Sequence, residues 1–224
     1  MLRRMPGKNR AVIAIVVLAV LALAGYWGYA EQQKRAQQAA VAAALTDTTA
    51  RLRDSLAVAS NATGKPALPR IDGHVAAVEA HLKTVRGATS VPELADGAEH
   101  YVLGAREILR RQAASIRQSE QSAASRAALV AHMRRAARRD GAWIRDAMAQ
   151  KKAVEAQYFD YGLTLKALAE LLRTFPDSKT RLAPHVAGQA LLDDAPAAEA
   201  RTLVLKESRR VADELASVRR LAPR

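Results

Sequence analysis

Five histidines are the side chains best suited to act as bases or metal ligands, and their spacing decides between these roles. His74 and His81 lie seven residues apart, which is two turns or about 10 Å along one face of a helix. A single metal ion needs ligands that lie closer together, often at positions i and i+4 of a helix. We therefore expect histidines on a helix surface, with no metal site and no bound cofactor.

Nucleophilic and phosphate chemistry lack the residues that they require. The chain has no cysteine, which excludes thiolate catalysis, disulfides and cysteine-based zinc sites. It contains neither the GxSxG motif of a serine nucleophile nor a glycine-rich phosphate loop. The adjacent carboxylates Asp193-Asp194 and Asp213-Glu214 are typical of solvated helix ends. We expect a protein that is not an enzyme.

Arginine is the charged side chain that the sequence concentrates in one region. Residues 106–145 contain ten arginines and three acids, within a chain of net charge +13. Like charges four residues apart on a helix repel each other slightly, so this density favours an acidic partner. The candidate anionic-partner face consists of Arg110, Arg111, Arg134, Arg135, Arg138, Arg139 and Arg145. The alternative is a solvated, arginine-rich helix face.

The first thirty residues have the pattern of a membrane anchor. A basic tail over 1–10 precedes an uncharged run over 11–30, which as a helix is about 30 Å long, the thickness of a bilayer core. Tyr26, Trp27 and Tyr29 are its expected membrane-interface anchors, because amphipathic rings prefer the headgroup level. The alternative is a signal peptide cleaved after Ala30.

The distribution of basic residues predicts the orientation of this span. Lysine and arginine are denser before the apolar run than after it, so the N-terminus is expected in the cytoplasm. We expect a signal-anchored bacterial inner-membrane protein whose C-terminal domain lies in the periplasm.

The rest of the chain has the composition of helices. Aromatic residues make up only 4% of the chain, which disfavours a sheet, and apolar residues recur at spacings of three and four. We expect a helical stalk over 31–60, a Pro/Gly linker over 61–70 and a helical bundle over 71–221. A break is expected at Asp140-Gly141, and Pro176-Asp177-Ser178 is expected to end the helical segment that precedes it.

Two further helices are expected near the C-terminus, a short one over 184–192 and a last one from Pro196 to Arg220. The predicted fold class is therefore all-α: one N-terminal transmembrane helix followed by an elongated, coiled-coil-like exported bundle. Whether 93–175 forms two helices or three stays open.

The sequence predicts a non-enzymatic, single-pass inner-membrane protein whose periplasmic helical domain is an envelope scaffold or interaction module. Expected partners are the bilayer through 11–30, a second copy of the chain in a homodimer, and an acidic envelope partner or anionic lipid. The first alternative is a cleaved, soluble periplasmic binding or stress-response protein. The second, a membrane-tethered cytoplasmic binder of nucleic acid, is disfavoured because no aromatic residues alternate with the arginines.

Overall fold

The computed structural model describes residues 7–61, 67–134, 140–186 and 191–221. For 7–17 and 58–61 it describes the backbone alone. Within these ranges the chain forms helices and no strands. The helices are α1 (Gly7–Asn61), α2 (Leu68–Arg86), α3 (Pro92–Arg134), α4 (Gly141–Leu182) and α5 (Asp194–Arg220).

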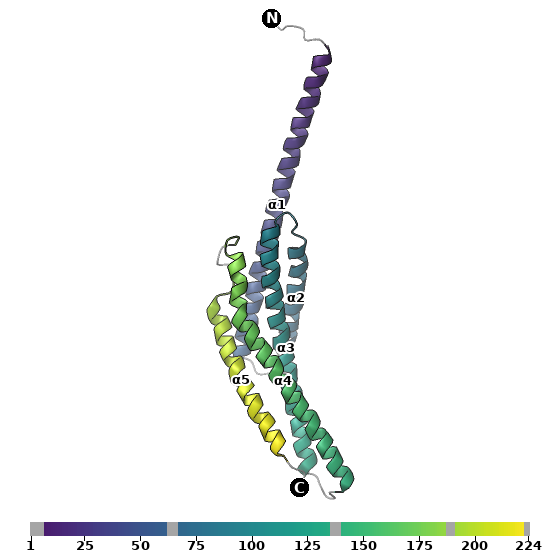
Figure 1. Ribbon diagram of the computed structural model, residues 1–224, viewed down its shortest axis with the longest axis vertical. Helices are drawn as coiled ribbons and strands as arrows, with labels where there is room; N and C mark the ends of the chain where they lie inside the picture. The colour runs from purple at the N-terminus through teal and green to yellow at the C-terminus, as the bar shows by residue number, and fades with distance from the viewer. Residues whose placement is uncertain (1–6, 62–66, 135–139, 187–190, 222–224) are drawn as a thin grey trace.

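The five helices run alternately down and up along one long axis (Figure 1). Helices α3 and α5 both run downward in this view and flank α4, which runs upward and packs along each of them. The first half of α1 projects beyond the bundle at one end, and α3, α4 and α5 extend beyond the ends of α1 and α2 at the other. The molecule is therefore an elongated rod whose cross-section changes along its length.

Helix α4 begins at a local sequence signal but does not end at one. The Asp140 carboxylate accepts a hydrogen bond of 2.9 Å from the Trp143 backbone N–H, which starts α4 at the predicted break. The prediction that Pro176-Asp177-Ser178 ends this helix is wrong, because α4 continues to Leu182. Phe175 and Leu182, on either side of the proline, are both buried, and their packing offsets the backbone hydrogen bond that Pro176 removes.

The connection between α4 and α5 differs from the expected short helix over 184–192. Residues 184–186 and 191–193 are not helical, and 187–190 lie outside the described residues. Helix α5 begins at Asp194, two residues before the expected proline.

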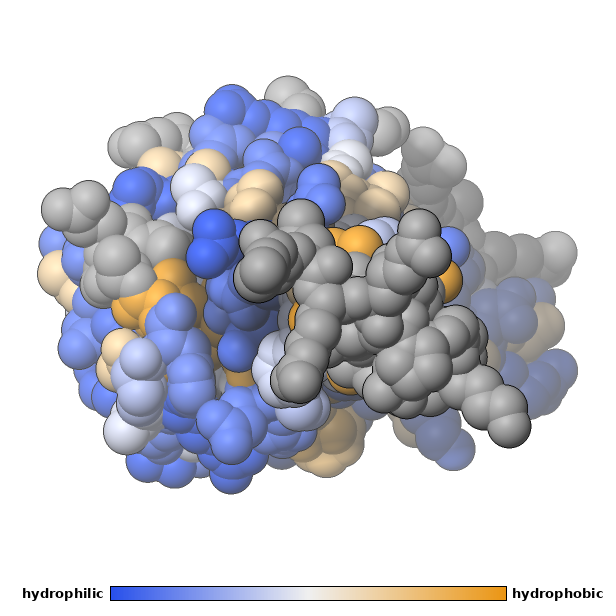
Figure 2. Space-filling model, turned by 90° about the horizontal axis from the view of Figure 1, so that it is seen from above, coloured by the Kyte–Doolittle hydropathy of each residue, from blue (hydrophilic) through white to orange (hydrophobic). Residues whose placement is uncertain are grey.

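The upper core joins all five helices. The side chains of α1 that enter it lie between Val41 and Leu56, so this part of the expected stalk packs inside the bundle. They contact α2, α3 and α5. From α2 and α3 the core receives the predicted apolar seams, which include Ile71, Val78 and Leu109. Seen end-on, most of the visible coloured surface is hydrophilic, and hydrophobic residues show in places between the helices (Figure 2).

The lower core is smaller and involves α3, α4 and α5 alone. Among the described residues it contains Leu129, Val154, Tyr158, Tyr161, Leu165, Val211 and Val218. Ile144 and Met148, which the sequence pattern places in an apolar seam, are 44% and 54% exposed. They are uncovered because, of the described helices, only α3, α4 and α5 reach this level of the rod.

The transmembrane part of the predicted fold is contradicted. No helix in the described part of the chain is both long and apolar enough to cross a membrane. The apolar side chains described before Glu31 begin at Leu18, and 18–30 spans about 20 Å as a helix, against about 30 Å for a bilayer core. The side chains of 11–17 lie outside the described residues. This finding contradicts the expected single-pass anchor over 11–30. It also contradicts the inner-membrane localisation and the periplasmic domain that were expected with that anchor.

Candidate functional site

The three aromatic residues expected at a membrane interface lie on the projecting half of α1. Tyr26, Trp27 and Tyr29 are 70%, 73% and 66% exposed. They do not contribute to either core of the bundle.

The predicted arginine face is divided along α3. Near the middle of the rod, Arg110 pairs with Glu79 of α2 at 2.5 Å, and Arg111 pairs with Glu107 at 2.8 Å. These two cations are therefore balanced by acids of the chain itself. Arg134 lies 24 residues further along α3, about 36 Å from Arg110, and is exposed.

The remaining arginines of the predicted face lie at the lower end or outside the described residues. Arg145 is exposed near the start of α4. Arg135, Arg138 and Arg139 fall outside the described ranges. Arg134 ends α3 and Arg145 lies near the start of α4, so both are at the lower end of the rod, away from Arg110 and Arg111 in the middle of α3.

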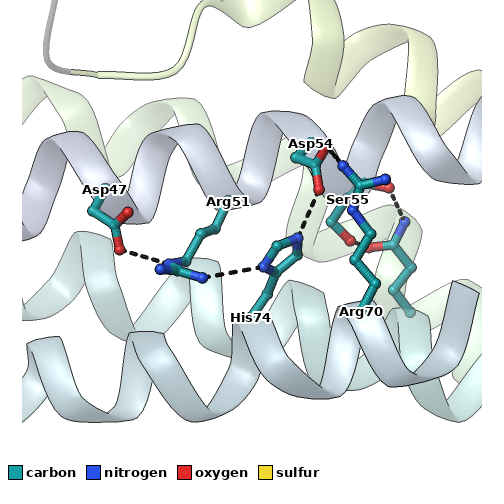
Figure 3. Close-up of polar contacts among 7 residues, drawn as sticks. Asp47, Arg51, Asp54, Ser55, Arg70 and His74 are labelled. Atoms are coloured by element: carbon teal, nitrogen blue, oxygen red, sulfur yellow. Dashed lines mark hydrogen bonds and ion pairs between the residues drawn. The ribbon is translucent and has the colours of Figure 1, made fainter.

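His74 lies in a polar network between α1 and α2 rather than on a free surface (Figure 3). Its Nδ1 atom is 3.4 Å from an Arg51 guanidinium nitrogen, and its Nε2 atom is 2.7 Å from Asp54 Oδ2. Because arginine can only donate, Nδ1 accepts and the ring proton sits on Nε2, which donates to Asp54. Arg51 is also paired with Asp47 at 2.6 Å, and Arg70 with Asp54.

His81 forms the same kind of histidine–aspartate pair two helical turns further along α2. Its Nε2 atom is 3.2 Å from Asp47 Oδ2, and its Nδ1 atom is 3.0 Å from the hydroxyl of Thr48. Burial lowers the pKa of His81, the nearby Asp47 carboxylate raises it by less, and Arg51 lowers it further. The neutral ring is therefore favoured, with the Thr48 hydroxyl donating to Nδ1.

The register of the two helices follows from equal spacings. Asp47 and Asp54 are seven residues apart on α1, and His74 and His81 are seven apart on α2. Because α1 and α2 are antiparallel, the later aspartate meets the earlier histidine, and the earlier aspartate meets the later one. This match is the sequence signal for both pairs, and the spacing of the histidines alone does not reveal it.

Thr48, His81 and Asp47 lie in the hydroxyl–imidazole–carboxylate order of a catalytic site, but the Thr48 side chain is fully buried and is therefore closed to a substrate. Ser55, another buried hydroxyl on α1, donates at 2.5 Å to Gln112 Oε1, and Gln112 Nε2 donates back to the Ser55 carbonyl at 2.9 Å. No three His, Cys, Asp or Glu residues in the described ranges lie close enough to hold a metal ion. What the arrangement does is fix α1 against α2 and α3.

Tyr101 ties the same region to the start of α5. Its hydroxyl is 2.8 Å from the Thr49 hydroxyl and accepts a 3.0 Å hydrogen bond from the Leu192 backbone N–H. Burial raises the pKa of Tyr101, so the phenol stays protonated beside the Thr49 hydroxyl. Its ring packs against Phe175 with centroids 4.9 Å apart.

A cavity of about 760 Å³ lies where the upper core meets the lower one. Leu56, near the end of α1, closes its upper end. Its walls are α3 and α5, and its floor is α4. The apolar lining consists of Leu56, Ile116, Leu165, Leu168, Leu172, Ala200, Leu203 and Val204. Leu203 is 41% exposed, so the wall offers apolar surface to an occupant.

The polar side of the cavity is built around Tyr161. Its hydroxyl donates to Glu207 at 2.7 Å, and Glu207 accepts two hydrogen bonds from Arg210 at 2.6 and 2.8 Å. The Arg210 guanidinium holds the pKa of Glu207 below its usual value, and the Tyr161 hydroxyl contributes in the same direction. Burial and the carboxylate raise the pKa of Tyr161. The cavity therefore carries a neutral phenol beside a closed ion pair.

The cavity continues as a groove between α3 and α5 toward the lower end. The next section of this groove is lined by Ala123, Ala127, Val130, Ala131 and Arg134 of α3, by Tyr158 of α4, and by Arg210 and Glu214 of α5. Arg126 of α3 pairs across the groove with Glu214 of α5 at 2.5 Å. From Gln112 to Arg134 the two sections together span about 33 Å of α3. We refer to both sections as the α3–α5 groove.

Comparison with known proteins assigns no relationship. No family model matches the chain, and neither a curated protein nor a solved structure matches it.

Proposed function

We propose that this protein is a non-enzymatic interaction module that binds a helical segment of a partner in the α3–α5 groove. The observation that carries the proposal is what fills the same space higher in the rod. There, α1 contacts both α3 and α5, and its apolar residues from Val41 to Leu56 pack between them. Below Asn61 this occupant ends, while α3, α4 and α5 continue.

The shape of the groove favours a helix over a compact small molecule. A groove of about 33 Å accommodates about 22 helical residues, which is six turns. Amphipathic helices bind such grooves by placing apolar residues at i, i+3, i+4 and i+7 against them. The exposed Leu203 and the small alanines of α3 match this mode, because small side chains allow a second helix to approach closely.

The experiment uses a fluorescent, 22-residue amphipathic peptide with leucine and alanine on one face and glutamine on the other. We expect fluorescence anisotropy to report saturable binding to the whole protein. Leu203→Ser is expected to weaken binding about tenfold, because burying one leucine contributes about 1.5–3 kcal/mol.

Leu205→Ser is the matched control. Leu205 is 39% exposed, close to the value for Leu203, but does not line the groove. An equal loss in both variants, or no binding to the wild-type protein, would contradict the proposal. If a small apolar dye binds the protein and the peptide does not, the cavity is assigned to a small ligand instead.

A further inference from the structure

We infer that the helix received by the α3–α5 groove is acidic at its N-terminal end and runs antiparallel to α3. This inference rests on the proposed function and specifies the partner of the same groove. It follows from how charge is distributed along the groove and from the direction of the helices that form it.

Charge changes along the groove. The upper section is lined by Glu120, Lys206, Glu207 and Arg210, so its formal charges cancel. The lower section shares Arg210 with the upper one and adds Arg126, Arg134 and Glu214, two further cations and one acid. An occupant that matches both sections is neutral near Leu56 and negative toward Arg134.

Arg134 is the cation best placed to meet a carboxylate of the partner. Arg126 is already paired with Glu214, and Arg210 with Glu207. Arg134 is exposed, lines the groove, and lies at the C-terminal end of α3. Within the described ranges no carboxylate pairs with Arg134, so a carboxylate of the partner can form a bidentate pair with its guanidinium.

Helix direction sets the orientation of the occupant. Helices α3 and α5 are parallel, and both end at the lower end of the rod (Figure 1). The C-terminal dipole ends of these two helices are negative and the N-terminal end of α4 is positive, so the two flanking helices outweigh α4 and favour an added helix with its positive N-terminal end beside them. Acidic residues also stabilise the first turn of a helix. An acidic N-terminal turn at this end is stabilised by its own helix dipole and by pairing with Arg134.

A second copy of this chain is a poor occupant. Each copy carries a net charge of +13, so docking two copies through a cationic groove brings like charges together. Charge complementarity instead favours an acidic helix that belongs to a different protein.

The test uses three peptides that share the apolar face of the neutral probe. One carries four glutamates in its first two turns, one carries the same glutamates in its last two turns, and one carries lysines in place of the first set. We expect the N-terminally acidic peptide to bind about tenfold more tightly than the other two at low salt, with the difference shrinking as salt rises.

Charge reversal locates the effect. Arg134→Glu is expected to remove the preference for the N-terminally acidic peptide, while Arg145→Glu, an exposed arginine at the same end that does not line the groove, is expected to retain it. Circular dichroism confirms that both variants keep their helices.

The outcomes separate this inference from the proposed function. Equal binding of all three peptides would overturn the acidic partner and leave helix binding in place. A preference for the C-terminally acidic peptide would overturn the orientation. Failure of every peptide, including the neutral probe, would overturn the proposed function together with this inference.

Discussion

At the scale of single residues, the environment of His81 links proton binding to folding. Burial lowers the pKa of the folded state below the ordinary value of 6.5. Its Nδ1 atom accepts from Thr48, a side chain that is fully buried. Protonation of Nδ1 removes this acceptor, so the unfolded chain takes up a proton at a higher pH than the folded chain does.

The stability of the protein is therefore expected to fall on acidification. Above pH 6.5 the contribution of His81 is fully present, and it is lost as the pH falls from 6.5 through the lowered pKa of the folded state. Urea unfolding at intervals between pH 8 and pH 5 measures this slope. His81→Asn should flatten it, while His100→Asn, which changes a histidine with a half-exposed ring, should not. An unchanged slope in His81→Asn would rule out His81 as its source.

At the scale of helices, two glycines in helix interiors have opposite packing environments. A Cβ atom added at Gly73 of α2 meets nothing within 4 Å. One added at Gly104 of α3 lies 3.1 Å from the Phe175 ring, which is buried against Tyr101. The first site is open, and the second faces the buried ring of Phe175.

Substitution at the two glycines should therefore change stability in opposite directions. Gly73→Ala should stabilise the protein by about 0.5–1 kcal/mol, because alanine favours the helix. Gly104→Val should destabilise it by about 1–3 kcal/mol, because its methyl groups overfill the space beside Phe175. Chemical denaturation of both variants tests this, and a stabilised Gly104→Val would show that the ring moves aside at little cost.

Most helices could be predicted from the sequence, because apolar spacing and turn residues act locally. Ile71, Val78 and Leu82 are buried as their spacing predicts. The extension of α4 past Pro176 could not be predicted, because it depends on the burial of Leu182 against distant parts of the chain. The membrane anchor expected over 11–30 is contradicted, as no described helix is long and apolar enough.

The groove was beyond prediction for a related reason. Leu203 belongs to an apolar stripe that the sequence pattern would bury, yet it is exposed. Whether it is covered depends on where α1 ends relative to α5, which is a property of the packed bundle. The paired spacings of Asp47 and Asp54 with His74 and His81 were, by contrast, present in the sequence.

At the scale of the whole molecule, the two cores differ in size and in the number of helices that cover them. The lower core contains seven buried apolar residues within the described ranges, from three helices. Regions with fewer buried contacts open more often. We expect backbone amides around Leu129 and Val218 to exchange hydrogen at least about tenfold faster than those around Leu109.

Hydrogen exchange followed by mass spectrometry tests this difference on the intact protein. Binding of the amphipathic peptide should slow exchange in the lower half of α3 and α5 and leave the upper half unchanged. Uniform exchange along α3 would show that both cores unfold as one unit.

The step from five helices to three also has a mechanical consequence. The flexural rigidity of a rod rises steeply with its cross-section, so deflection under a transverse load concentrates just below the level where α1 and α2 stop. Because α3, α4 and α5 run through that level without interruption, the rod flexes there elastically rather than at a hinge. A helix added to the groove would thicken the weak section, so occupancy would set the stiffness of the rod.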